Sequence, residues 1–77
     1  MQVKLLGVQN VNFTNSNGET VSGTNIFCAF KDSNVEGLRS EKFFIKKDIT
    51  LPDCKPNETL ELTFNMKGKV EAIHKSN

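Results

Sequence analysis

The hydrophobic residues of this chain recur mainly at every second position, which is the spacing of a β-strand with one face turned to a core. Residues 58–66 show this most clearly, and the side chains expected to point inward there are Leu60, Leu62, Phe64 and Met66. Four other segments alternate in a similar way; they are residues 2–14, 19–32, 41–46 and 69–74. No stretch carries the 3.6-residue period of an amphipathic helix. The pattern therefore predicts an all-β chain of five strands.

Two glycines coincide with irregularities in this alternation. Around Gly7 the apolar positions change from odd to even numbers and back, and a strand changes face only at a bulge or bend. We therefore expect the first strand to bend near Gly7 and a second bulge to lie at Gly23. The dipeptide Asn17-Gly18 tolerates positive φ and predicts the turn that joins the first two strands.

The segments between the other strands contain turn-forming residues. Residues 33–40 are expected to form a loop, and residues 47–57, which hold both prolines, a connection with room for a turn of helix. A tight turn is expected at Lys67-Gly68, directly before the last strand. On that strand Val70 and Ala72 are expected to point to one face, and Lys69, Glu71 and Ile73 to the other.

Five strands in 77 residues favour a small closed barrel, because closure removes sheet edges that so short a chain cannot cover with helices. We expect a single domain, residues 1–77, with the architecture of an oligonucleotide-binding (OB) barrel. Its long first and second strands are punctuated by glycine, which allows them to coil around the barrel. An SH3-like barrel is the alternative, because it has the same number of strands and differs in how they are connected.

The charge balance excludes a strong overall electrostatic field. Ten Lys and Arg residues against nine Asp and Glu residues give a net charge of +1, so a charged partner would have to be held by a local patch. The apolar stretch at the amino terminus is too short for a signal peptide, and no run approaches the roughly 20 apolar residues of a membrane helix. We therefore expect a cytoplasmic protein in which Cys28 and Cys54 are reduced thiols.

Catalytic groups are scarce in the sequence. The single histidine is His74, the five glycines are scattered rather than gathered in a phosphate loop, and the acidic residues are dispersed. Two cysteines and one histidine at these spacings match no zinc motif. We expect a protein without catalytic residues, metal or cofactor.

The most informative residues lie on the second and third strands. If Cys28, Phe30, Phe43 and Ile45 point to the core, their immediate neighbours along the strands point outward. That outward set is Phe27, Lys31, Lys42, Phe44 and Lys46, which Arg39, Lys67 and Lys69 could extend. Aromatic rings flanked by lysines suit stacking on bases combined with neutralisation of phosphates, so the sequence predicts a surface for single-stranded DNA or RNA.

The competing interpretation assigns the two aromatic residues to protein contacts. Phe27 and Phe44 could be covered by the loop 33–40 or by the interface of a homodimer, as in a small protein-interaction or accessory domain. Salt dependence of binding distinguishes the two functions, because contacts to phosphates weaken with salt and apolar protein contacts do not.

The run Val11–Gly18, followed by the strand through Phe27–Phe30, resembles the opening of the small single-stranded DNA-binding (helix-destabilising) proteins of filamentous phages and mobile elements. The resemblance covers about the first 32 residues. This chain has no tyrosine, and Asn15 to Asn17 supply no positive charge where those proteins carry a basic hairpin. The resemblance implies an OB barrel that works as a homodimer and coats single strands without sequence preference.

Overall fold

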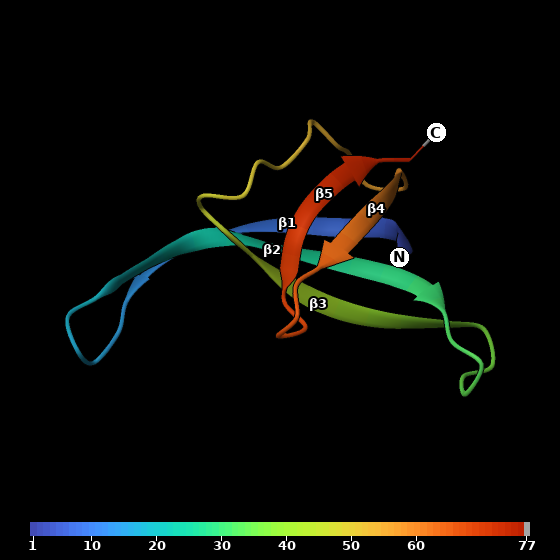
Figure 1. Ribbon diagram of the computed structural model, residues 1–77, viewed down its shortest axis with the longest axis horizontal. Coiled ribbons are helices and arrows are strands. Elements are labelled where there is room, and N and C mark those ends of the chain that lie inside the picture. Colours follow the sequence, from blue (N-terminus) through green and yellow to red (C-terminus); the bar gives the residue numbers. More distant parts are fainter. Residues whose placement is uncertain (77) are drawn as a thin grey trace.

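The computed structural model describes residues 1–76, and these form five antiparallel β-strands without a helix (Figure 1). The strands, in chain order, are β1 (Gln2–Thr14), β2 (Thr20–Lys31), β3 (Leu38–Lys46), β4 (Thr59–Phe64) and β5 (Val70–Lys75). All five belong to one sheet with the order β3-β2-β1-β4-β5. The all-β fold with five strands that the hydrophobic pattern predicts is thus confirmed.

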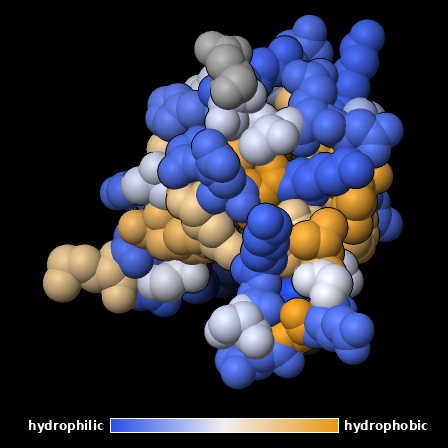
Figure 2. Space-filling view, turned by 90° about the vertical axis from the view of Figure 1, so that its right-hand side faces the viewer, coloured by the Kyte–Doolittle hydropathy of each residue, from blue (hydrophilic) through white to orange (hydrophobic). Residues whose placement is uncertain are grey.

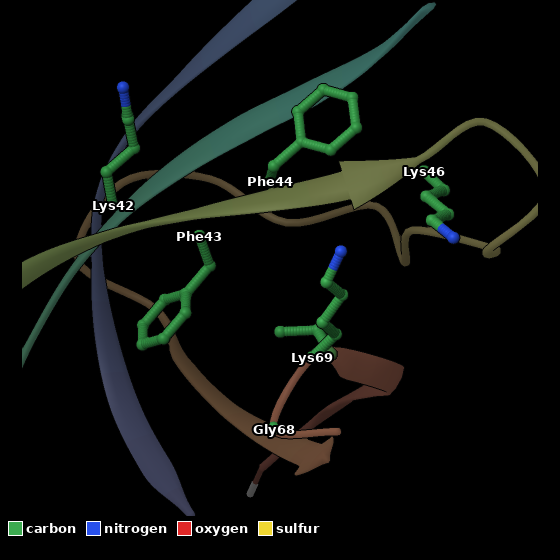
Figure 3. Close-up of a pocket in the computed structure, with 7 residues that line it drawn as sticks. Lys42, Phe43, Phe44, Lys46, Gly68 and Lys69 are labelled. Carbon is green, nitrogen blue, oxygen red and sulfur yellow. The ribbon is translucent and has the colours of Figure 1, made fainter. Parts of the chain in front are cut away.

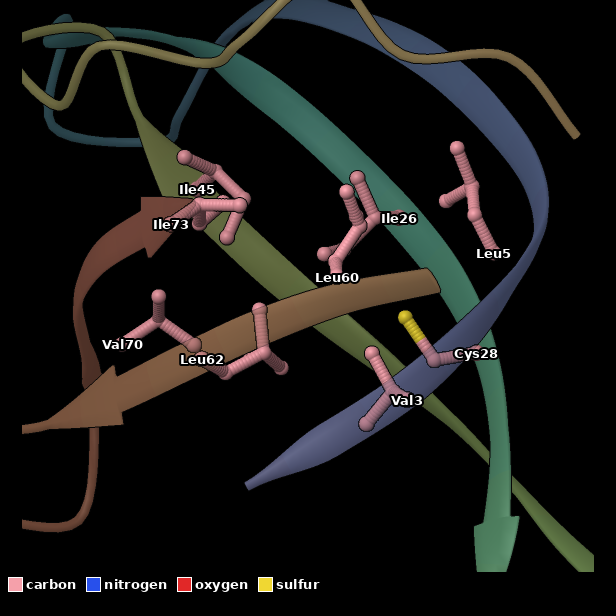
Figure 4. Packing of buried hydrophobic residues seen from close by; sticks show 9 residues of the cluster. All are labelled: Val3, Leu5, Ile26, Cys28, Ile45, Leu60, Leu62, Val70 and Ile73. Atoms are coloured by element: carbon pink, nitrogen blue, oxygen red, sulfur yellow. The ribbon is translucent and has the colours of Figure 1, made fainter. Parts of the chain in front are cut away.

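The sheet curls into two layers that enclose the core. β1, β2 and β3 form a long curved layer, and the β4–β5 hairpin crosses it (Figure 1). β1 joins the layers, because its first residues pair with both β2 and β4. Buried side chains from the two layers meet between them (Figure 4); they are Val3, Leu5, Ile26, Cys28, Ile45, Leu60, Leu62, Val70 and Ile73.

The sheet is not closed into a barrel, which corrects the expectation of a closed one. β3 and β5 form its two edges and lie near each other, but no hydrogen-bonded pairing joins them within residues 1–76. The ring of Phe43 on the edge strand β3 packs instead against that of Phe64 on β4, with centroids 5.8 Å apart. An opening remains between β3 and the β4–β5 turn.

The first strand bends where the sequence predicts a bend. The pairing of β1 with β2 shifts register between Leu5 and Gly7, and Leu6, the residue between them, is exposed. At Gly23, in contrast, pairing with both β1 and β3 continues without a shift. The expected bulge at Gly23 is therefore wrong, and the glycine serves a close approach of β3 to β2.

A bulge that the sequence did not reveal lies in the β4–β5 pair. The register shifts between Thr63 and Phe64, which leaves β5 with one extra residue between Val70 and Ala72. As a result Val70 and Ile73 are both buried in the core. Strict alternation would place Ile73 on the opposite face, so that expectation is wrong.

The turns of the β1–β2 and β4–β5 hairpins have the same construction. In each, the side-chain oxygen of an asparagine accepts hydrogen bonds from two backbone N–H groups of the turn. These asparagines are Asn15 and Asn65, and the glycine three residues later has a φ of 80° at Gly18 and 79° at Gly68. The turn predicted at Gly18 is confirmed. The second turn places Met66 in solvent, so the expectation that Met66 points to the core is wrong.

The third strand is longer than the pattern predicts. β3 begins at Leu38 rather than at residue 41, which shortens the loop that precedes it. Arg39 lies opposite Phe30 of β2, and its guanidinium forms ion pairs with Asp32 and Glu41. These contacts hold the start of β3 against the end of β2. The connection from β3 to β4 contains turns and no helix.

The two cysteines are free thiols in different surroundings. Cys28 is fully buried in the core, as the pattern predicts, while Cys54 is half-buried and packs against the core from the β3–β4 connection. Burial, with a smaller contribution from Cys54, raises the pKa of Cys28 to about 11. The Cys28 thiol therefore behaves as a small apolar side chain.

Hydrophilic side chains dominate the end of the molecule at which both termini and the β2–β3 loop lie (Figure 2), and hydrophobic side chains form patches between them. Among residues 1–76 there is no helix that is long and apolar enough to cross a membrane.

Candidate nucleic-acid interface

The predicted binding residues lie mainly on the face of β1, β2 and β3 that turns away from the core, here called the outer face. The strand pairing arranges this face in rows that run from β3 across β2 to β1. Three successive rows are Lys42, Phe27 and Gly7; Phe44, Asn25 and Gln9; and Lys46, Gly23 and Val11. Lys31 lies farther along β2, opposite Leu38. The structure thus brings five of the six predicted residues to one face.

The two aromatic rings of the outer face are open to solvent. Phe27 and Phe44 retain exposed fractions of 38% and 40%, so the β2–β3 loop does not cover them. They occupy diagonal positions on neighbouring strands, because Phe27 lies opposite Lys42 and Phe44 lies two residues farther along β3. Such positions are about 7–8 Å apart, which leaves each ring free to take its own planar partner.

Each ring rests against a glycine of the neighbouring strand. A Cβ atom added at Gly7 would lie 3.7 Å from Cδ2 of Phe27, and one added at Gly23 would lie 2.5 Å from Cζ of Phe44. The position at Gly23 also faces the backbone oxygen of Ile45 at 2.5 Å, so no side chain fits there. Gly23 therefore allows β3 and the ring of Phe44 to approach β2 closely.

The lysines of the outer face have no acidic neighbours on that face. They are Lys4, Lys31, Lys42 and Lys46, and the strand positions that share the face hold no Asp or Glu. Among the described residues none of these four lysines forms an ion pair. Four lysines therefore share the outer face with the two rings and form no ion pair among the described residues.

Arg39 is the predicted residue that the structure does not bring to the outer face. It lies opposite Phe30, on the other face of the sheet, and its guanidinium is 3.0 Å from Asp32 and 2.7 Å from Glu41. The hydrogen bond to Asp32, followed by that to Glu41, raises the pKa of Arg39. The pKa of Asp32 is lowered, first by the backbone N–H of Asn34 and then by Arg39. Arg39 thus secures the β2–β3 loop.

A cleft of about 230 Å³ lies at the border of the outer face, between β3 and the β4–β5 turn (Figure 3); we call it the seam. Its lining residues are Lys42, Phe43, Phe44, Lys46, Gly68, Lys69 and Val70. Figure 3 shows Phe43 and Phe44 leaving β3 on opposite sides and Lys69 reaching from the turn toward β3. Lys67, in the same turn, lines an adjacent hollow together with Lys46 and Lys69. Lys67 and Lys69, two of the three predicted extensions of the patch, therefore lie beside the outer face.

Sequence reasoning missed three residues of this site. The sequence pattern predicts bulges at Gly7 and Gly23, although Gly23 shares the odd numbering of Phe27 and so its outward face. Lys4 alternates with the buried Val3 and Leu5, which places it outward on β1. The contacts of Gly7 with Phe27 and of Gly23 with Phe44 become visible only when the register between the strands is known.

Metal-ligating side chains do not gather in the part of the chain that the structure describes, since no three His, Cys, Asp or Glu residues lie close enough to hold an ion. His74 is exposed near the end of β5. What the outer face does offer is apolar surface for stacking and free ammonium groups for anions.

Comparison of the chain with protein-family models, with curated proteins and with solved structures finds no match.

Proposed function

We propose that this protein binds single-stranded nucleic acid without sequence preference and without catalysing a reaction. The ligand that we expect is single-stranded DNA. The observation that carries the proposal is the composition of the outer face. Two exposed rings, Phe27 and Phe44, rest on glycines and share this face with lysines that form no ion pair among the described residues.

The rings account for binding to bases. An exposed phenyl ring keeps apolar surface in water, and a base stacked on it covers that surface. Stacking of a base on an aromatic side chain contributes about 1–3 kcal/mol and tolerates any sequence, because every base has a π-face. Phe27 and Phe44 together could therefore hold two bases without reading their identity.

The lysines account for binding to the phosphates. A phosphate neutralised by a lysine releases counterions, so each such contact steepens the decrease of affinity with salt. The net charge of the whole chain is only +1, which makes this attraction local to the outer face. A strand is accordingly expected to lie along β2 and β3 rather than at random over the surface.

The strand order also supports the proposal. In an OB barrel the first strand lies between the second and the fourth, and the third and fifth strands face each other across the closing seam; this chain has the order β3-β2-β1-β4-β5. In an SH3-like barrel the first strand would pair with the last, whereas here β1 pairs with β2 and β4. The face of strands 2 and 3 is a usual oligonucleotide-binding surface of OB folds. We therefore propose an OB-type topology that is open at the seam.

A homodimer is the second candidate function, and the β1–β2 hairpin favours it. This hairpin continues beyond the core as an arm (Figure 1), near the end of which Phe13 is 53% exposed and lies opposite Val21. A second copy of the chain could cover these apolar side chains.

The two candidate functions predict different responses to salt. Titrating a labelled dT oligomer at several salt concentrations should give a logarithm of affinity that falls linearly with the logarithm of salt. The expected slope is about −0.7 for each phosphate held, and thus about −3 if the four outer-face lysines each hold one. Sedimentation of the free protein at the same salt concentrations measures whether it forms a dimer. A salt-resistant dimer that does not bind the oligomer would favour the second candidate and contradict the first.

A further inference from the structure

Lysines from two separate parts of the chain line the seam. Lys42 and Lys46 come from β3 and Lys69 from the β4–β5 turn, and no acidic residue lines the cleft with them. Within residues 1–76 none of the three forms an ion pair. A cleft lined by ammonium groups without an acidic partner attracts an anion.

The floor of the seam is apolar and fixed in position. Phe43 and Val70 line it, and the ring of Phe43 packs against Phe30 and Phe64 with centroid distances of 6.5 and 5.8 Å. The volume of about 230 Å³ is below the roughly 300–1,000 Å³ of pockets that enclose a drug-sized ligand. The cleft therefore suits a small anionic group that belongs to a chain continuing outside it.

The seam is continuous with the outer face. Phe44 and Lys42 belong to both surfaces, since they line the seam and also lie in the rows of the outer face. A strand stacked on Phe44 that continues past the edge of β3 would enter the seam next to Lys69. We infer that the seam binds a phosphate group of the nucleic-acid backbone where the strand crosses β3, and that Lys69 holds this phosphate from the β4–β5 turn. This inference rests on the proposed function.

Lys69→Gln tests the inference without disturbing the turn. The turn uses the backbone N–H and C=O of Lys69, which bond to Asn65, and leaves the side chain free. Lys55→Gln is the matched control, because Lys55 is exposed, lies on the β3–β4 connection and changes the net charge equally. Both variants and the wild type are titrated with a labelled dT oligomer over a range of salt concentrations.

Loss of one phosphate contact should reduce the steepness of the salt dependence by about 0.7 in Lys69→Gln. That change corresponds to an affinity about fivefold weaker near 0.1 M salt, with the difference vanishing near 1 M. Lys55→Gln should match the wild type. If both variants match the wild type while Phe44→Ala binds more weakly, the seam inference is overturned and the proposed function stands. If the wild type does not bind the oligomer, both the seam inference and the proposed function are wrong.

Discussion

Replacing Leu60 with alanine should lower the free energy of unfolding by about 2–5 kcal/mol, the usual range for deleting a buried leucine side chain. Leu60 is fully buried and lies opposite Val3 in the β1–β4 pairing that joins the two layers. A domain of this length has a total stability of about 4–12 kcal/mol, so the variant should be largely unfolded at moderate urea concentrations. Urea denaturation followed by circular dichroism measures the loss.

Thr63→Ala is the control for this variant, because Thr63 lies on the same strand with its side chain exposed. Its cost should stay below about 1 kcal/mol. Equal losses for Leu60→Ala and Thr63→Ala would mean that β4 does not present one face to the core, and the two-layer arrangement would be wrong.

Replacing Phe44 with alanine should weaken the binding of a dT oligomer by about 5- to 150-fold, which corresponds to the 1–3 kcal/mol of one stacked base. The fold should survive, since Phe44 is 40% exposed and lies outside the buried core. Fluorescence anisotropy with a labelled oligomer measures the affinity, and a thermal unfolding curve checks the fold.

Phe44→Trp is the informative companion, because it keeps an aromatic surface at the same place and should retain binding. Phe44→Leu keeps an apolar side chain next to Gly23 but removes the ring, so it should bind as weakly as the alanine variant. Unchanged affinity in Phe44→Ala, or full affinity in Phe44→Leu, would show that no base stacks on this ring.

Much of the fold could be predicted because alternation is a local property of each strand. In β4 the period of two runs without interruption, and Leu60 and Leu62 are buried as expected. In β5 one extra residue changes the phase, and Ile73 moves to the core. A bulge of this kind depends on the partner strand, which a local pattern does not contain. The open seam could not be predicted for the same reason, since it lies between β3 and the β4–β5 turn, which are far apart in the sequence.

Some residues of the candidate site could likewise be predicted from a single strand and others could not. Alternation places Phe27, Phe44 and their lysines outward, because it depends only on the sequence of each strand. Arg39 has the odd numbering of the inward-facing Phe43 and Ile45, but the turn-forming residues around it predict a loop, where alternation has no meaning. Because β3 in fact begins at Leu38, alternation places Arg39 on the inward face.

The packing of Phe27 on Gly7 and of Phe44 on Gly23 cannot be predicted from the pattern of a single strand. Gly23 is needed because a ring and a backbone oxygen of β3 come within 2.5 Å of where its Cβ would lie. That proximity is set by the register between β2 and β3, which becomes known only when the strands are paired.

Nuclear magnetic resonance can test most directly the central claim that the outer face binds a single strand. In a titration of the labelled protein with a dT oligomer, the backbone amide signals of Phe27, Lys42 and Phe44 should shift progressively. The signals of Thr63 and His74, which are exposed on the β4–β5 hairpin, should stay in place. Shifts confined to the hairpin, or no shifts at all, would contradict the claim.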